Sequence, residues 1–188
     1  SHFVRLTRDL LDVSRLQAGQ LPLRHRHLDL ATIAQAVAAR ECPRLDLGER
    51  LILTLPTGLP RVDADPDRLD QVLANLLENA AKYSPGGGPI EVAVGAEDGG
   101  VLLRVKDAGI GLPPGATETI FTPFGRAANA TARRIPGLGL GLVICRDIAA
   151  RHGGRLWAES AGEGQGTTMH LWLPIAQAGI TATADAAD

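Results

Sequence analysis

The alternation of apolar and polar residues predicts a two-faced helix that begins near Pro66 and carries the segment 75–82. The apolar residues of this helix recur at helical spacing and share one face, so that face can pack on a sheet; they are Val72, Leu73, Leu76, Leu77 and Ala80. The opposite face carries Asn75 and, one turn later, Asn79, followed by Lys82. A helix face with two carboxamides and an ammonium group is a poor core face, which indicates a binding role.

Cap residues and turn residues divide the rest of the chain into helices and strands. Asp65 suits the N-cap of the helix above, with Pro66 at its first position, and Asp29 suits the N-cap of an earlier helix that extends to about Arg40. Apolar segments between glycines and prolines predict strands. The predicted strands cover 51–55, 90–94, 101–105, 155–159 and 167–173, and a further helix covers 138–151. The second and third strands form a hairpin, and the last two form a pair around a glycine loop.

The two ends of the chain differ from this central region. Residues 3–18 predict a helix with a short coiled-coil-like seam, which Gly19 and Pro22 end. Because the sequence begins inside this helix, we expect the chain to be part of a longer protein. The predicted parts are the end of a helical hairpin (1–19), a linker (20–27), a globular domain (28–174) and a disordered tail (175–188).

Composition narrows the class of protein. The chain has 188 residues, 45% hydrophobic and 21% charged, with a formal net charge of -2, which gives no reason to expect binding to nucleic acid or to an anionic membrane. The two cysteines, Cys42 and Cys145, fit no metal or redox spacing, and no segment is long and apolar enough to span a bilayer. We therefore expect a cytoplasmic domain that makes no membrane contact of its own, whether or not its parent protein is anchored.

The polar helix face suits a magnesium ion and a polyphosphate. The amide oxygens of Asn75 and Asn79 are hard ligands of the kind that Mg²⁺ prefers, and the ammonium group of Lys82 suits phosphate. A second candidate is Asp107-Ala108-Gly109-Ile110-Gly111, which follows a strand. A carboxylate at a strand end can accept a hydrogen bond from the exocyclic amine of adenine, and glycines let the backbone pass close to a flat ring. By itself, the same pattern also fits an ordinary turn.

Two further glycine-rich segments have similar alternatives. The segment 137–142 opens a helix with alternating glycines, so its free N–H groups and the helix dipole favour phosphate, although a flexible hinge is an equal alternative. It is not a Walker loop, because no Gly-Lys-Ser/Thr follows. The segment 162–168 precedes a strand and, by itself, fits a hairpin turn.

The segment between these glycine motifs predicts a mobile lid. Two of the three phenylalanines, Phe121 and Phe124, lie close together and are followed by small and polar residues that include Arg133 and Arg134. We expect the two rings to pin the lid and the arginines to be available to phosphate. The alternative is a surface loop with a solvated pair of charges.

Taken in this order, the segments resemble the catalytic and ATP-binding domain of bacterial sensor histidine kinases, in the gyrase–Hsp90–histidine kinase–MutL superfamily. The matching motifs are the N box (75–85), the first glycine box (107–111), the F box (121–124), the second glycine box (137–142) and the third glycine box (164–168). The resemblance covers about residues 28–174. Upstream, residues 9–19 resemble the end of the second dimerisation helix of the same kinases, which favours the kinases over other members of the superfamily.

The resemblance implies an α/β fold of the Bergerat type, a two-layer sandwich in which helices cover one face of a mixed sheet. It also implies that Asn79 ligates Mg²⁺, that Lys82 contacts the phosphates of ATP and that Asp107 binds N6 of adenine. The other residues expected to bind the nucleotide are Asn75, Tyr83, Gly109, Gly111, Phe121, Arg126, Gly137, Gly139, Leu140, Gly141, Leu142 and Thr167.

The resemblance further implies a phosphoryl acceptor outside this sequence. ATP-hydrolysing relatives carry a glutamate where Asn75 stands, and an amide cannot act as that base, so we expect slow hydrolysis and transfer to a histidine instead. No histidine here lies in the phosphoacceptor motif of the family: we interpret His25 and His27 as solvated, His152 as a helix C-cap and His170 as a surface strand residue. The chain should therefore bind Mg-ATP without phosphorylating itself.

The expected partners are ATP, the dimerisation hairpin of the same protein and a response regulator receiver domain. One alternative is a serine kinase or anti-sigma switch protein of the same superfamily, which would lack the dimerisation helix. Another is a degenerate nucleotide-binding scaffold, although intact Asn79, Lys82 and Asp107 argue against it.

Overall fold

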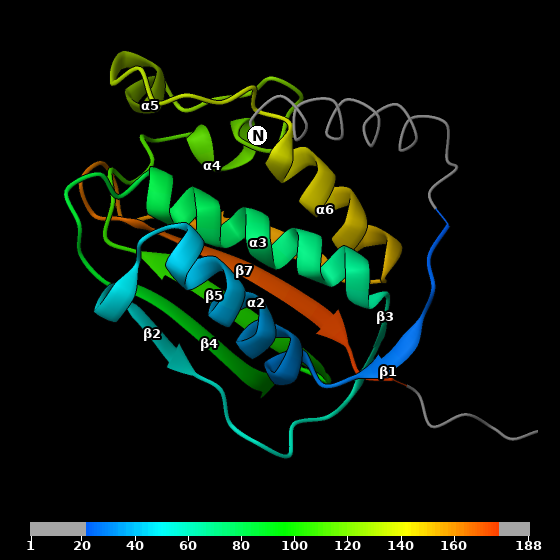
Figure 1. The fold of residues 1–188 in the computed structure, drawn as a ribbon. Coiled ribbons are helices and arrows are strands. Elements are labelled where there is room, and N and C mark those ends of the chain that lie inside the picture. Colours follow the sequence, from blue (N-terminus) through cyan, green and yellow to red (C-terminus); the bar gives the residue numbers. More distant parts are fainter. Residues whose placement is uncertain (1–21, 177–188) are drawn as a thin grey trace, which may run out of the picture.

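The computed structural model describes residues 22–176 and shows a two-layer α/β fold, in which helices cover one face of a sheet (Figure 1). Its elements are β1 (Arg26–Leu28), α2 (Leu30–Arg44), the 3₁₀ turn η1 (Gly48–Arg50), β2 (Leu51–Thr54), β3 (Val62–Ala64), α3 (Pro66–Lys82), β4 (Ile90–Glu97), β5 (Gly100–Asp107), α4 (Ala116–Thr119), α5 (Ala128–Ala132), α6 (Gly141–Arg151), β6 (Arg155–Glu159) and β7 (Thr167–Pro174). The predicted helix over 3–18 and the tail beyond residue 176 lie outside the described residues. Within the described part, no helix has the length and apolar character needed to cross a bilayer.

The main sheet has five strands in the order β2-β4-β5-β7-β6, and β1 and β3 form a separate antiparallel pair. Strand β2 is parallel to β4, whereas the other three pairings of the sheet are antiparallel. The two predicted strand pairs, 90–94 with 101–105 and 155–159 with 167–173, are therefore confirmed. The prediction of a mixed sheet with helices on one face is also confirmed.

Helix α3 lies between α2 and α6 on the covered face of the sheet (Figure 1). It begins as predicted, since the Asp65 side chain accepts hydrogen bonds from the N–H groups of Asp67 and Arg68 and Pro66 occupies the first turn. Its predicted apolar face is buried, with Leu73, Leu76 and Leu77 at most 1% exposed. At about 25 cal/mol for each Å² of apolar surface removed from water, this face anchors the helix to the sheet.

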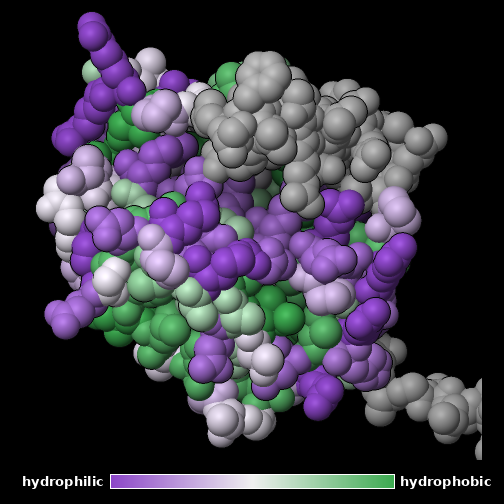
Figure 2. Space-filling model, in the orientation of Figure 1, coloured by the Kyte–Doolittle hydropathy of each residue, from purple (hydrophilic) through white to green (hydrophobic). Residues whose placement is uncertain are grey.

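Helix α2 extends four residues past its predicted end. The carboxylate of Glu41 is almost fully buried and is paired with Arg40 and Arg44 on the same helix. Arg40 also pairs with Asp70 of α3, at 2.7 Å. These ion pairs let charged residues continue the helix, and Figure 2 shows hydrophilic residues gathered over this helical face.

Helix α6 begins at Gly141, three residues later than predicted. Gly137 and Gly139 have φ angles of 147° and 73°, which are incompatible with a right-handed helix. The segment 137–140 therefore reaches α6 as an extended, glycine-rich approach, although periodicity alone favoured a longer helix.

The predicted linker and tail differ from the structure at their inner ends. Arg26 and His27, expected in the linker, form β1 with Leu28. At the other end, Ile175 forms a bridge with Val62, and the N–H of Ala176 donates to the carbonyl of Arg61 at 2.7 Å. Short backbone pairings of this kind have no hydrophobic period, so the sequence pattern does not reveal them.

Two histidines, His152 and His25, lie next to each other beside the start of α3. His152 caps α6 as predicted: its Nδ1 lies 2.7 Å from the carbonyl oxygen of Ile148, and its Nε2 accepts from the N–H of Asp65. His25 is not simply solvated, because it contacts the carbonyl of Asp63 and its ring lies 5.1 Å from that of His152. Burial lowers the pKa of His152, and the neighbouring His25 lowers it further, against the hydrogen bond to Ile148.

The uncovered face of the sheet carries both tryptophans. Trp157 of β6 and Trp172 of β7 flank the guanidinium group of Arg155, at 5.4 and 5.3 Å from their ring centroids. Trp157 also stacks on His170, with ring centroids 4.8 Å apart. The prediction of His170 as a surface residue is therefore wrong, because the indole covers it and leaves it 7% exposed.

Candidate functional site

A pocket opens between α3, the end of β5, the segment 110–130 and the glycine-rich approach to α6. Its lining brings together thirteen of the fifteen residues that the sequence proposed for the site, from five separate parts of the chain. These residues are Asn75, Asn79, Lys82, Tyr83, Asp107, Gly111, Arg126, Gly137, Gly139, Leu140, Gly141, Leu142 and Thr167. Residues distant in sequence therefore form one continuous surface.

Gly109 and Phe121 do not line the pocket. The N–H of Gly109 instead donates a hydrogen bond to the carboxylate of Asp107 at 2.8 Å, which helps to orient that carboxylate. A side chain at Gly109 would be impossible, since a Cβ atom there would lie 2.1 Å from the carbonyl oxygen of Tyr83. Phe121 is buried, and the guanidinium of Arg146 lies 5.0 Å from its ring centroid.

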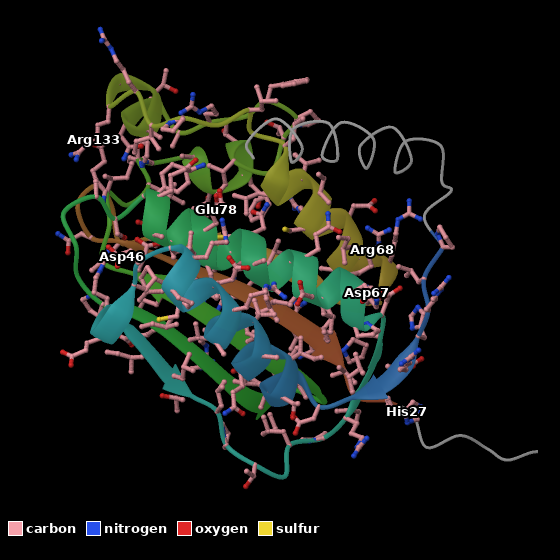
Figure 3. The ribbon with its side chains drawn as sticks, viewed as in Figure 1. His27, Asp46, Asp67, Arg68, Glu78 and Arg133 are labelled. Atoms are coloured by element: carbon pink, nitrogen blue, oxygen red, sulfur yellow. The ribbon has the colours of Figure 1, made fainter. Side chains whose placement is uncertain are left out.

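Both phenylalanine rings were expected to pin the lid, but only one of them is buried. Phe121 is buried, but Phe124 is 65% exposed and its backbone has a φ of 61°. The N–H of Phe124 donates to the carbonyl of Gly139, so the backbone at this position, rather than the ring, joins the lid to the second glycine box. Arg133, labelled in Figure 3, lies at the end of α5, and neither it nor Arg134 lines the pocket.

Asp107 is the last residue of β5 and the one buried carboxylate in the pocket lining. Its Oδ1 accepts from Gly109 N and, at 3.4 Å, from the hydroxyl of Ser84. Burial raises the pKa of Asp107, against the opposing effect of hydrogen bonds from Gly109, Thr167 and Ser84. Such a carboxylate is poorly solvated, so an incoming N–H donor gains a strong, charge-assisted hydrogen bond there.

Apolar side chains surround Asp107 and form a slot that suits a flat ring. They come from α3, from the segments that follow β5 and from β7: Leu76, Ala80, Ile110, Leu112, Ile120, Ala127, Ala130 and Met169. Sequence reasoning did not assign these residues to the site, nor Ser84, which holds Asp107. Met169 follows Thr167 by two positions on a strand, so its side chain shares the same face of the sheet, and this spacing could have revealed it.

The polar face of α3 points at the start of α6. The Nδ2 of Asn79 donates to the Oδ1 of Asn75 at 3.1 Å. Asn75 in turn lies against Gly141, where a Cβ atom would come within 2.4 Å of the Asn75 Nδ2. The contact between the two amides uses the donor end of Asn79, and its carbonyl oxygen is the kind of atom that a hard cation takes.

Positive charge and free backbone donors meet at the other end of the pocket. The Nζ of Lys82 lies 4.5 Å from the ring centroid of Tyr83 and adjacent to Gly137. Helix α6 begins beside it, and its cap residue, Leu140, makes no side-chain hydrogen bond to the first turn. The unpaired N–H groups of a helix N-terminus and a nearby ammonium together favour an anion.

Comparison with known proteins identifies the family of this chain. The model of the family "Histidine kinase-, DNA gyrase B-, and HSP90-like ATPase" matches residues 64–177. The chain is 34% identical over 173 residues to the sensor histidine kinase WalK of Bacillus subtilis (strain 168), covering 91% of this chain and 28% of WalK. It is 38% identical over 170 residues to the adaptive-response sensory kinase SasA of Synechococcus sp. (strain JA-2-3B'a(2-13)), covering 89% of this chain and 44% of SasA. The chain thus spans less than half the length of these relatives.

Solved structures give the same result. Full-length ShkA in complex with AMPPNP superposes with a TM-score of 0.79 at 30% identity, over 93% of this chain and 36% of that one. The mycobacterial sensor histidine kinase MprB gives a TM-score of 0.68 at 29% identity, over 81% of this chain and 98% of that one. The chain therefore belongs to the histidine kinase-, DNA gyrase B- and HSP90-like ATPase family, and its fold is that of the ATP-binding catalytic domain of a sensor histidine kinase.

Proposed function

We propose that this domain binds ATP with Mg²⁺ and donates the γ-phosphoryl group to a histidine on a dimerisation hairpin of the same protein. The observation that carries the proposal is the convergence in one pocket of a buried carboxylate, an amide-bearing helix face and a helix N-terminus. These three features suit the base, the metal and the phosphates of a single nucleotide.

The base end of the pocket accounts for a preference for adenine. Asp107 accepts a hydrogen bond from the exocyclic N6 amine, and the apolar slot holds the ring. A guanine base presents a carbonyl oxygen at the corresponding position. Two acceptors would then face each other in a buried site, which costs about 1–3 kcal/mol or more.

The phosphate end is built for charge. The first-turn N–H groups of α6 and the Nζ of Lys82 receive the phosphate oxygens. Asn79 offers one amide oxygen to Mg²⁺, and the phosphates supply further oxygens, since this ion is usually held by few protein ligands. The oxygen-donor chemistry of Asn79 fits the ion, which would neutralise charge on the transferred group.

The residues around the phosphate site favour a histidine over water as the acceptor of the phosphoryl group. The resemblance puts Asn75 where a base would activate water, but its amide accepts a hydrogen bond from Asn79 and lies against Gly141. Hydrolysis is therefore slow, and an imidazole, which is a nucleophile without a strong base, is the better acceptor. Within residues 22–176, His152 and His170 are buried in structural contacts, so neither suits this role.

The remaining partners follow from the relatives. WalK and SasA are named as sensory kinases, which supports a dimerisation hairpin as the source of histidine and a response regulator receiver domain as the final acceptor. A cytoplasmic setting supplies both ATP and that receiver domain. The relatives named above give no support to a serine kinase or a degenerate scaffold.

Two measurements test the proposal. Titration calorimetry of the purified chain should show saturable binding of ATP that is stronger with Mg²⁺ than with a chelator. Radiolabel from γ-labelled ATP should then appear on a separately purified dimerisation hairpin of the full-length protein only when this chain is present. Label on this chain alone, or transfer that persists in an Asp107→Asn variant at low ATP, would contradict the proposal.

A further inference from the structure

One side chain joins the lid to the loop that holds Asp107. Asn129 lies on α5, and its Nδ2 donates to the carbonyl oxygens of Ile110 at 3.2 Å and Gly111 at 3.0 Å. Its Oδ1 accepts from the N–H of Ala130 at 2.9 Å. Both donor hydrogens and the acceptor of the amide are thus in use, and these partners fix which end is nitrogen.

The two carbonyls belong to a segment that is itself firmly held. The N–H of Ile110 donates to Tyr83, at the end of α3, at 2.9 Å. The carbonyl of Ile110 also accepts from Gly164 in the third glycine box at 2.8 Å. The first glycine box is therefore fastened to the end of α3 and to the third glycine box, and Asn129 fastens the lid to it.

The rest of the lid is bonded mainly to itself. The segment 126–135 closes its own turns, and the guanidinium of Arg126 donates to the carbonyl of Ile135 within the same segment. Among the residues that the structure describes, Asn129 makes the only hydrogen bonds between this segment and the remainder of the domain. Its apolar contacts with the domain come from Ala127, Ala130 and Ile135, which are buried.

These bonds close one wall of the pocket. Arg126, Ala127 and Ala130 line it from the lid, and Ile110 and Gly111 line it from the loop to which Asn129 is bonded. If the two Asn129 hydrogen bonds break, the segment 126–135 can move away from the base, because no other hydrogen bond in the described part ties this segment to the rest of the domain. Opening by local rearrangement of this kind is the usual route for ligand exchange under a lid.

We propose that Asn129 is a positioning residue, a latch between the lid and the adenine-binding loop that slows nucleotide release and holds Arg126 against the pocket. This inference rests on the proposed function, since it assumes that a nucleotide occupies the pocket. The latch contributes to nucleotide retention more than to transfer, so its loss raises KM for ATP while leaving kcat nearly unchanged.

Two substitutions separate the latch from other roles of the residue. Asn129→Ala removes the latch and the contact to Ala130. Asn129→Asp keeps an oxygen for the N–H of Ala130 but loses both donors and sets a carboxylate against two carbonyls. The matched control is Thr131→Ala on the same helix, because the Thr131 hydroxyl donates only to Ala127 within the lid.

The experiment uses the whole chain and a fluorescent ADP labelled on the ribose, chased with excess ATP in a stopped-flow instrument. We expect dissociation to be about tenfold faster in Asn129→Ala and at least as fast in Asn129→Asp, as expected for two lost hydrogen bonds. Thr131→Ala should match the wild type. Release at the wild-type rate from Asn129→Asp would overturn the latch, because this variant has no N–H group to donate to Ile110 and Gly111 and places a charge against them.

Hydrogen exchange of the nucleotide-free chain gives a second readout that does not depend on binding. The amides of residues 127–135 should exchange faster in Asn129→Asp than in the wild type, while those of α3 are unchanged. Equal exchange in both proteins would also overturn the latch. If the wild-type chain fails to bind the labelled ADP while the exchange difference is present, the proposed function fails and the latch stands.

Discussion

The two walls of the pocket are held in different ways. The wall formed by α3 and β5 rests on large, buried apolar side chains such as Leu73, Leu76 and Leu103. The lid wall, formed by the segment 126–135, has fewer buried side chains, namely Ala127, Ala130 and Ile135, and the amide of Asn129 ties it to the adenine-binding loop. A packed wall fixes where base and metal bind, whereas a wall held by two hydrogen bonds can open without unfolding the domain. Substitutions on the first wall should therefore change affinity, and those on the second should change rates.

The largest effect is expected at Asp107. Asp107→Asn replaces a buried charged acceptor by an amide, and one end of that amide must face the N–H of Gly109. We expect the Kd for ATP to rise by about two orders of magnitude, the upper range for a hydrogen bond to a charged group. Titration calorimetry measures it, with Asp98→Asn in the exposed β4–β5 turn as the control. Unchanged affinity would show that Asp107 does not bind the adenine base.

The next effect concerns the metal. Asn79→Ala removes the amide oxygen proposed for Mg²⁺ but keeps the helix, since alanine favours it. We expect ATP to bind this variant equally weakly with Mg²⁺ and with a chelator, whereas the wild type should show a clear difference. Titration calorimetry in a buffer with Mg²⁺ and in a buffer with a chelator measures this difference. A variant with normal dependence on Mg²⁺ would show that Asn79 is not a ligand.

A steric test of the contact between α3 of the first wall and the start of α6 follows at Gly141. Gly141→Ala would place a Cβ atom 2.4 Å from the Nδ2 of Asn75, so Asn75 or the first turn of α6 must shift. We expect ATP affinity to fall about tenfold even though alanine stabilises helices. Gly95→Ala in β4 is the control, because a Cβ atom there meets nothing within 4 Å. If both variants bind alike, the position of α6 does not matter for the phosphates.

The smallest expected effect is a dependence of the melting temperature on pH, and it arises from His152, which lies outside both walls of the pocket. The pKa of His152 is lowered in the folded protein from an ordinary 6.5, so the unfolded chain binds a proton more readily. Stability contributed by neutral His152 is complete above pH 6.5 and is lost as the pH falls below it. The melting temperature should therefore drop between pH 7 and 5, by about 2–4 °C for each kcal/mol lost.

Two variants assign this pH effect. His152→Gln should flatten the dependence of the melting temperature on pH, and His27→Gln, at an exposed position of β1, should leave the wild-type slope. An unaltered slope in His152→Gln would mean that the loss arises elsewhere, for instance at His170, whose pKa burial also lowers.

The contrast between the walls also explains what the sequence could predict. Helix α3 was predicted closely because its caps and its apolar period are local signals, and Asp107 because a glycine pair follows a strand. The outward turn of Phe124, the burial of His170 under Trp157 and the bonds of Asn129 depend on residues distant in sequence. Periodicity carries no information about such contacts, so the lid wall was the less predictable one.

The positions of the aromatic residues determine what optical spectroscopy can detect. Both tryptophans of the chain lie on the uncovered face of the sheet, whereas the single tyrosine, Tyr83, lines the pocket beside Lys82. Selective excitation of indole would therefore report on the solvent side of β6 and β7 and remain silent when a nucleotide enters. A tryptophan placed at exposed Phe124 would instead give the lid a reporter of its own.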